Sequence, residues 1–302
     1  MIVPQTRRLV FLTIKYVGLQ LLGLVAYDVA IVILYQAGYL KWTALEQIPL
    51  SLFGSVIGLI LAFRNSSSYG RWWEARTLWG SIVNNSRSWA RAVTTVMCGD
   101  GDREFAQVRR QMVYYQIAWV HALRQHLRLL EPWGEIAGVL TPEQIDELRG
   151  QKNVPVAIQQ RQSLLLRRAL DVGWIDMAQW HAMNQSLNDL VDAQGGAERI
   201  KNTPMPRQYD YLPQLCTQVF CFLLPLVMVS ALGWFTPLGS TLVGFIFLAL
   251  DKIGRDLEDP FDNTLHDIPL TAMCRTIEIN LRQMLGETEL PPEENPVDGV
   301  LW

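Results

Sequence analysis

The chain has 302 residues, of which 50% are hydrophobic and 18% are charged, and its formal net charge is −3. The charged fraction is below the roughly 25% typical of a soluble domain, and the apolar residues are clustered, which favours a protein that lies partly in a membrane. The small negative charge gives no electrostatic reason to expect a nucleic-acid partner. The cysteines have neither disulfide nor zinc spacing, so we expect small thiols and no metal: Cys98, Cys216, Cys221 and Cys274.

Four apolar segments predict transmembrane helices: about 9–35, 48–63, 211–235 and 238–250. The first is long enough to cross a bilayer of about 30 Å at about 1.5 Å per residue. It lacks a small-residue cleavage site and therefore reads as a retained span and not as a signal peptide. The second segment is short and crosses a bilayer only if its helix continues past Arg64. A turn with Gly, Pro and two aromatic residues at 233–239 separates the last two segments.

The distribution of basic residues predicts the orientation. Arg7 and Arg8 precede the first segment, whereas the 36–48 connection carries only Lys41 and the 236–240 turn carries no basic residue. Five arginines follow the second segment: Arg64, Arg71, Arg76, Arg87 and Arg91. The positive-inside rule therefore places both termini and the 64–208 region in the cytoplasm.

The chain then divides into four parts: a first transmembrane pair at 1–63, a cytosolic helical region at 64–208, a second transmembrane pair at 209–252, and a C-terminal cytosolic helix and tail at 253–302. An apolar stripe of helical period runs through 104–130. Capping boxes at Thr141 and Asp176 predict the starts of two further helices, the second spanning 177–194 and ending at Gly195–Gly196. No run of strand periodicity occurs, so we expect an all-α fold.

Two stripes of residues run along the 48–63 segment. The first consists of small residues four apart, which let another helix approach closely: Gly54, Gly58 and Ala62. The second lies about 100° further round the helix and is narrow and mostly apolar: Ser55, Leu59 and Phe63. A helix that packs along one face and presents the other to an axis is what a symmetric pore requires. The alternative is that the second stripe faces lipid or another span.

Charged residues within the apolar segments need a partner or a function. Asp28 lies deep in the first segment and Lys15 near its start, and a carboxylate there costs about 2.5–3.5 kcal/mol on insertion scales. Asp251 and Lys252 end the fourth segment, where we expect them at the membrane interface. The acidic run 256–262 has no EF-hand spacing and reads as a solvated helix end. No metal-binding HExxH, phosphate-binding or nucleophile-elbow motif occurs, so the sequence supports no enzyme and no cofactor.

Three stretches resemble one known family. They are 48–80, which contains FRNSSSYGRWWEARTLWG, 204–261, which contains LDKIGRDLEDPF, and 265–285, LHDIPLTAMCRTIEINLRQML. Together they cover nearly half of the chain, in the family's order. On these residues the chain resembles the bestrophin ion channels, and is most similar to their prokaryotic branch.

The resemblance implies a homopentamer around one axial pore. The hydrophobic neck of the family falls on Ser55, Leu59 and Phe63, where a serine replaces the usual bulky apolar residue at the outer position, so we expect a wider and wetter outer neck. The second constriction, the aperture, falls near Met177 and Ala178, with Ile175 and Trp180 as alternatives. Candidate contacts for a permeating anion are Arg64, Asn65 and Ser66.

The resemblance also bears on calcium. Animal bestrophins hold calcium in a clasp of acidic residues that corresponds to 262–267 here, and this chain has the neutral residues Asn263, Thr264 and Leu265 in its middle. The ligand set is therefore depleted, and we do not expect control by calcium.

The sequence thus predicts a bestrophin-type channel in a bacterial inner membrane, in contact with lipid and passing small monovalent ions, chloride or other anions. One alternative is a cation-selective channel of the same fold. The other is a secondary transporter or a membrane signalling module, although we find neither the inverted repeats of transporters nor a nucleotide motif.

Overall fold

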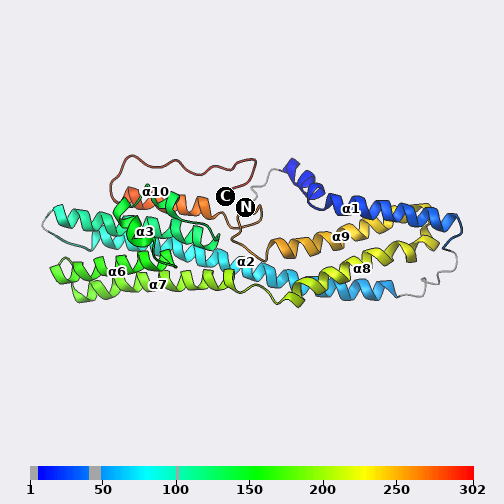
Figure 1. Cartoon of the computed structure of the whole chain (residues 1–302), viewed down its shortest axis with the longest axis horizontal. Coiled ribbons are helices and arrows are strands. Elements are labelled where there is room, and N and C mark those ends of the chain that lie inside the picture. Colours follow the sequence, from blue (N-terminus) through cyan, green and yellow to red (C-terminus); the bar gives the residue numbers. More distant parts are fainter. Residues whose placement is uncertain (1–5, 41–48, 100, 102) are drawn as a thin grey trace. The chain divides into compact units, whose positions relative to one another are not determined.

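The computed structural model describes residues 6–40, 49–99, 101 and 103–302, with side chains from residue 18 onward. Within these ranges the chain is helical and contains no strand, which confirms the all-α prediction. The helices are α1 (Thr6–Gln36), α2 (Leu50–Thr95), α3 (Arg103–Leu127), α4 (Trp133–Ile136), α5 (Pro142–Leu148), α6 (Val154–Val172), α7 (Met177–Asn202), α8 (Arg207–Leu232), the 3₁₀ helix η2 (Gly233–Phe235), α9 (Thr236–Asp256) and α10 (Leu270–Met284) (Figure 1). Lys41 and Trp42 lie outside the described residues.

The chain divides into two compact units. Residues 6–72 and 204–259 form the first, which we call the apolar unit, and residues 73–203 and 260–302 form the second, which we call the polar unit. Helix α2 contributes its first part to the apolar unit and its second part to the polar unit. The apolar unit contains the segments expected as the two transmembrane pairs, and the polar unit contains most of the two parts expected in the cytosol, with the divisions after residues 72, 203 and 259 instead of 63, 208 and 252. The assignment of these parts to membrane and cytosol stays a prediction.

In the apolar unit, α1, α8 and α9 pack against one another (Figure 1). Ile57 and Leu61 of α2 are buried against Phe220 and Leu224 of α8. Close approach of α1 and α9 depends on Gly244, because a Cβ atom there would overlap the side chain of Leu24. In a membrane, where lipid is as apolar as these side chains, close packing of this kind stabilises the contacts between helices.

Helix α2 is continuous over 46 residues. It passes through Arg64 and the serines that follow without interruption, which confirms the continuation that the short second segment needs. The sequence between Leu50 and Thr95 contains no proline, so every residue can keep its backbone hydrogen bond to the preceding turn.

In the polar unit, α3 packs against α6, α7 and α10 (Figure 1). Three fully buried tryptophans occupy the core: Trp79, Trp89 and Trp119. Two of them donate a hydrogen bond, Trp89 Nε1 to the Met112 carbonyl at 3.3 Å and Trp119 Nε1 to Gln194 Oε1 at 3.1 Å. The ring N–H groups of Trp89 and Trp119 are thus satisfied while the apolar area of each ring is buried.

A buried charged cluster holds α10 to α3. The carboxylate of Glu278 lies 3.1 Å from His121 Nε2, 2.8 Å from Arg275 Nη1 and 2.8 Å from Arg282 Nη2. Burial opposes ionisation of Glu278, but the hydrogen bond to His121 and the charges of His121 and Arg275 outweigh it and lower the pKa of Glu278 to about 2. The carboxylate therefore stays charged and paired at neutral pH.

The local signals for helix starts are confirmed. The side chains of Thr141 and Asp176 each accept a hydrogen bond from the backbone N–H three residues on, at 3.4 and 2.7 Å, and both capping boxes are complete. The predicted end at Gly195–Gly196 is wrong, because α7 continues to Asn202. A Cβ atom at Gly196 would lie 2.9 Å from Leu78 Cδ2, so this glycine permits close packing of α7 on α2 instead of ending the helix.

Three helical stretches among the described residues are long and apolar enough to cross a membrane: Gly18–Gln36, Leu50–Thr95 and Arg207–Asp256. The third contains α8, η2 and α9, and Gly233 at its bend has a φ of 50°. Only glycine adopts this region at little cost, which explains its place between the two helices.

Candidate functional site

One face of α2 in the apolar unit is exposed although it is mostly apolar. Leu59 and Phe63 are 58% and 64% exposed, and Ser55 is exposed on the same face. On the opposite face, Ile57 and Leu61 are buried against α8. The helix therefore has a buried seam and an unpartnered stripe at the positions expected from the sequence.

The exposed stripe carries no fixed charge. The Ser55 hydroxyl donates to the Ser51 carbonyl at 2.8 Å, and the Ser67 hydroxyl donates to the Phe63 carbonyl at 3.0 Å. Each hydroxyl uses its proton within the helix and presents oxygen lone pairs outward. Ser66 is also exposed.

The stripe of small residues has mixed surroundings. A Cβ atom at Gly54 would lie 3.3 Å from Phe220 Cζ, so this glycine packs within the chain. The same construction at Gly58 meets no atom within 4 Å, and Ala62 is exposed. Gly58 and Ala62 therefore have space around them among the residues that the structure describes.

Arg64 lies directly after the exposed stripe and is buried, with only 1% of its side chain exposed. Its Nη1 is 2.8 Å from Asp251 Oδ1 of α9, and its Nη2 forms an ion pair with Asp210 of α8. Glu258 is more distant, with its Oε2 4.0 Å from Nη2. We call Arg64 and these three carboxylates the arginine clamp, because it ties α2 to α8 and α9.

Neighbouring polar groups complete the clamp. Asn65 Nδ2 donates to the Leu250 carbonyl at 3.0 Å, and Arg71 Nε donates to the Glu258 carbonyl at 3.0 Å. Gly254 allows this approach, because a Cβ atom there would overlap the Asn65 side-chain oxygen. Two consecutive side chains of α2 are therefore committed to α9.

These contacts change the interpretation of two sequence candidates. Arg64 was expected among the contacts of a permeating anion, but its guanidinium is buried and neutralised by carboxylates. Asp251 was expected at a membrane interface, which stays a prediction; within the chain it is 2% exposed and lies between Arg64 and Arg255, whose Nη2 is 2.8 Å from its Oδ2. Of the three candidate anion contacts, only Ser66 is fully on the exposed face.

Asp28 has structural partners. It is completely buried, and its two carboxylate oxygens accept hydrogen bonds from Ser240 and Thr241 of α9, each at 3.1 Å. This arrangement satisfies a carboxyl group within an apolar helix and joins α1 to α9. The side chain of Lys15 is not among those described.

The aperture candidates lie at the start of α7 in the polar unit. Met177 is 63% exposed and Ala178 is exposed, both within the first turn that Asp176 caps. The alternatives differ from them, since Ile175 is only 4% exposed and Trp180 is half-buried. Exposure therefore favours Met177 and Ala178 over Ile175.

The segment after Pro260 is closed on itself. Asp267 is 2% exposed, and its carboxylate accepts the backbone N–H of Thr264 at 3.1 Å and also the Thr264 hydroxyl. Asp262 forms an ion pair with Lys201 of α7. The acidic groups of this segment are thus engaged by the protein's own donors.

A comparison with known families identifies the family to which the chain belongs. A family model described as "Bacterial/Fungal Bestrophin protein" matches residues 12–283. The chain belongs to the bestrophin family. The resemblance found in the three sequence stretches is confirmed over nearly the whole chain.

Relatives and solved structures agree with this bestrophin assignment. The chain is 36% identical over 254 residues to the voltage-dependent anion channel-forming protein YneE of Escherichia coli K12, covering 82% of this chain and 80% of YneE. It is 30% identical over 279 residues to the voltage-dependent anion channel-forming protein mll4386 of Mesorhizobium japonicum, covering 92% and 87%. The crystal structure of a bacterial bestrophin homolog from Klebsiella pneumoniae matches with a TM-score of 0.85 and 31% identity, covering 90% of this chain and all of that one.

Sequence reasoning missed the carboxylates of the clamp in this bestrophin. Asp210 and Asp251 are 146 and 187 positions away from Arg64, too far for any local pattern to pair them. The available signal was a cationic residue inside an unbroken helix with acidic residues at the ends of two other apolar segments. That signal indicates that partners are needed but does not identify them.

The clamp predicts a large loss of stability on removal of its arginine. Arg64→Leu should lower the free energy of unfolding by about 3 kcal/mol, because it removes one of the two arginine partners of the buried Asp251 carboxylate and the ion pair with Asp210. The double variant Arg64→Leu with Asp251→Leu should be less destabilised than Arg64→Leu alone. Chemical unfolding of the purified protein in detergent measures both values.

The matched control is Arg167→Ala, which removes an ion pair with Asp171 in which both side chains are more than half exposed. It should cost no more than about 1 kcal/mol. Equal losses for Arg64→Leu and Arg167→Ala would contradict the clamp.

The closed 260–268 segment predicts that calcium does not bind there. Calcium requires six to eight oxygen ligands, and the Asp267 and Asp262 carboxylates already have partners within the chain. Adding calcium to EDTA-treated protein should leave its melting temperature unchanged. Binding at 100 times Kd would instead stabilise the protein by about 2.7 kcal/mol, which a thermal melt would detect.

Proposed function

We propose that this chain is the subunit of an ion channel that passes small anions, chloride among them, through a pore lined by the exposed stripe of α2. Membership of the bestrophin family supports a channel over an enzyme, a transporter or a signalling module. The relatives YneE and mll4386 carry names that describe anion channel formation, which supports anions as the permeant class.

The observation that carries the proposal is the exposed stripe itself. Ser55, Leu59 and Phe63 lie on a face of α2 that no described residue covers, while the arginine clamp and Phe220 hold other faces of the helix. A helix held firmly from behind can present apolar side chains at a constant distance from an axis. We assign these three residues to the neck of the pore.

A neck of this composition would control ion passage through the amount of water that it admits. A narrow apolar ring disfavours water and so opposes ion passage, and widening or wetting it favours conduction. The side chain of Ser55 is smaller and more polar than those of Leu59 and Phe63. The outer end of the neck therefore has less apolar volume. The barrier to ions is therefore concentrated at Leu59 and Phe63.

The second constriction is assigned to Met177 and Ala178 at the start of α7. The N-terminus of a 26-residue helix carries partial positive charge, which favours anions near these side chains. The Asp176 carboxylate lies at the same helix end and offsets part of that charge. We therefore expect a weak preference for anions from this region.

The assembly that fits this assignment is a homopentamer with four spans in each subunit, formed by α1, the first part of α2, α8 and α9. The length of α1 and the bend at η2 between α8 and α9 support the count of spans. Gly58 and Ala62, which have space around them in the single chain, supply a surface for a neighbouring subunit.

Selectivity has one open alternative, a cation channel of the same fold. The observation that favours it is the absence of a cation from the neck stripe, since Arg64 is buried in the clamp. The anion assignment rests instead on the family relatives, on helix termini and on Ser66. The sign of the reversal potential in asymmetric potassium chloride separates the two.

The neck assignment predicts the effect of three substitutions on current. Phe63→Ala and Leu59→Ala should raise open probability or conductance, because each removes apolar volume from the ring. Ser55→Ile should lower the current, because it adds apolar volume at the outer end. Planar-bilayer recording of the purified protein in asymmetric potassium chloride measures these changes together with the sign of the permeant ion.

Phe53→Ala is the matched control, since Phe53 is 53% exposed on a different face of α2. It should leave the current per channel unchanged. If all three stripe variants assembled normally and conducted like the parent protein, the pore would have to be lined by other residues.

We place the protein in the bacterial inner membrane. The distribution of basic residues favours an orientation with both termini in the cytoplasm. A variant without Cys98 that carries Trp234→Cys in η2 should react with an impermeant thiol reagent added outside the cell, because Trp234 is 67% exposed. The same background with Gln151→Cys should not react. Labelling at position 151 from outside would reverse the orientation.

A further inference from the structure

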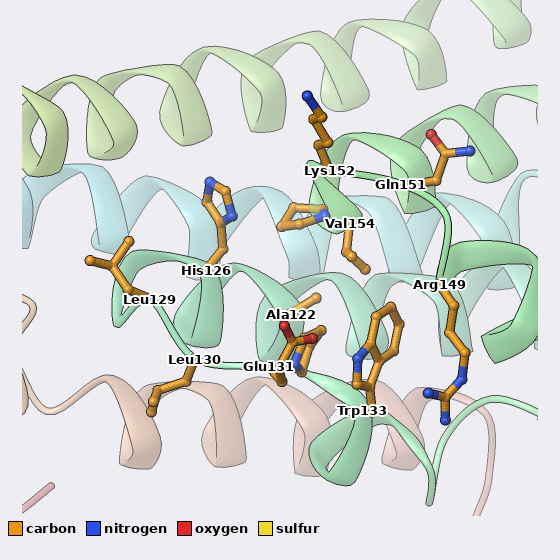
Figure 2. A pocket seen from close by; sticks show the side chains of 12 residues that line it. Ala122, His126, Leu129, Leu130, Glu131, Trp133, Arg149, Gln151, Lys152 and Val154 are labelled. Carbon is orange, nitrogen blue, oxygen red and sulfur yellow. The ribbon is translucent and has the colours of Figure 1, made fainter.

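The described residues that line one hollow in the polar unit include none that is assigned to the pore. The hollow has a volume of about 390 Å³ and lies where α3 ends and α6 begins, between the loops 128–132 and 149–153 (Figure 2). This volume is within the range of sites for small organic molecules. The function of the channel assigns nothing to it.

One cation in the lining of the hollow is unpaired. Lys152 is exposed and forms no ion pair with any residue that the structure describes. Arg149 also lines the hollow but is paired with Asp146, and Glu131 is the one carboxylate among the described lining residues. Lys152 is therefore the cation that is available for an anion.

An aromatic ring forms one wall. The Arg149 guanidinium lies 5.3 Å from the ring centroid of Trp133, and Figure 2 shows both side chains at the same edge of the hollow. Arg149 Nε is also 3.2 Å from Asp146 Oδ1, which limits its movement. Trp133 thus presents a flat aromatic surface at this edge of the hollow, with Arg149 over its ring.

Two exposed leucines form the rim at the end of α3. Leu129 and Leu130 are 76% and 58% exposed, and Leu129 has a φ of 57°. This backbone region is normally taken by glycine at a helix end, and a leucine there carries a cost of about 1–2 kcal/mol. The positive φ ends α3, because the Leu130 N–H then donates to the Gln125 carbonyl at 2.9 Å, and it leaves both leucine side chains exposed beside the hollow.

A hydrogen-bonded network fixes the far side of the hollow. His126 Nε2 lies 3.4 Å from Glu198 Oε1 of α7, and the same oxygen accepts from Asn153 Nδ2 at 3.0 Å and from Gln194 Nε2 at 2.7 Å. Asn153 also caps α6. The walls are therefore preorganised by three helices, which lowers the cost of binding a ligand.

From these features we infer that the hollow binds a small organic carboxylate with a flat apolar body. Lys152 would pair with the carboxylate, and Trp133 would cover the flat body. Inorganic phosphate fits less well, because it would leave the aromatic wall without a partner. This inference is independent of what passes through the pore.

Calorimetric titration of the purified full-length channel with sodium benzoate tests the site, in a low-chloride buffer to limit competition for the cations. Benzoate should bind, and benzamide, which has the same ring without the charge, should bind at least about 10-fold more weakly. Lys152→Ala should weaken benzoate binding about 10-fold, and Trp133→Leu should weaken it by about 2–10-fold.

Arg91→Ala is the matched control, because Arg91 is an exposed cation on α2 in the same unit. It should leave benzoate binding unchanged, and melting curves should show that all variants are folded. Absence of benzoate binding would overturn the inference. So would binding that is insensitive to Lys152→Ala, or inorganic phosphate binding as tightly as benzoate.

Discussion

The ion pair of Arg64 is the interaction on which the rest of the apolar unit depends. It allows one uninterrupted helix to change from an apolar to a polar surface without leaving a charge unpaired in the interior. Asp251 and Asp210 supply the compensating charge, and Asn65 and Arg71 add hydrogen bonds from the same helix. Because a buried guanidinium needs several oxygens in fixed positions, these contacts also fix the rotation of α2 about its axis. The rotation decides which residues of α2 remain uncovered.

The pairing of buried charge seen at Arg64 also occurs elsewhere in this protein. Buried polar groups such as Asp28 and Glu278 have partners on other helices and hold the helices together. The face of α2 that lacks partners is nearly free of charge. An uncharged, apolar surface of this kind needs to be covered by lipid, by another subunit or by a narrow column of water. Such a surface is consistent with the neck of a pore. The buried charged side chains of this protein thus hold helices together, although charged residues in an ion channel often contact permeating ions.

Glycines have two different structural roles in this protein. Gly196 was expected to end a helix, yet it lies within α7 and allows contact with Leu78, and Gly254 allows Asn65 to approach α9. Gly233, in contrast, has a positive φ at the bend between α8 and α9. A glycine in a sequence therefore indicates that space or backbone freedom is needed. Which of the two applies depends on what packs against it.

The sequence by itself determined the features that arise within a few residues of one another. Capping boxes at Thr141 and Asp176, the continuous α2 and the stripe of Ser55, Leu59 and Phe63 all follow from hydrogen bonds and periodicities that span about four residues. Only the tertiary structure decided that Arg64 is buried, that Asp251 is its partner, that α7 passes Gly195–Gly196, and that Lys152 and Trp133 border one hollow. These depend on side chains that folding brings together from positions as far as 187 residues apart, and no local pattern carries that information.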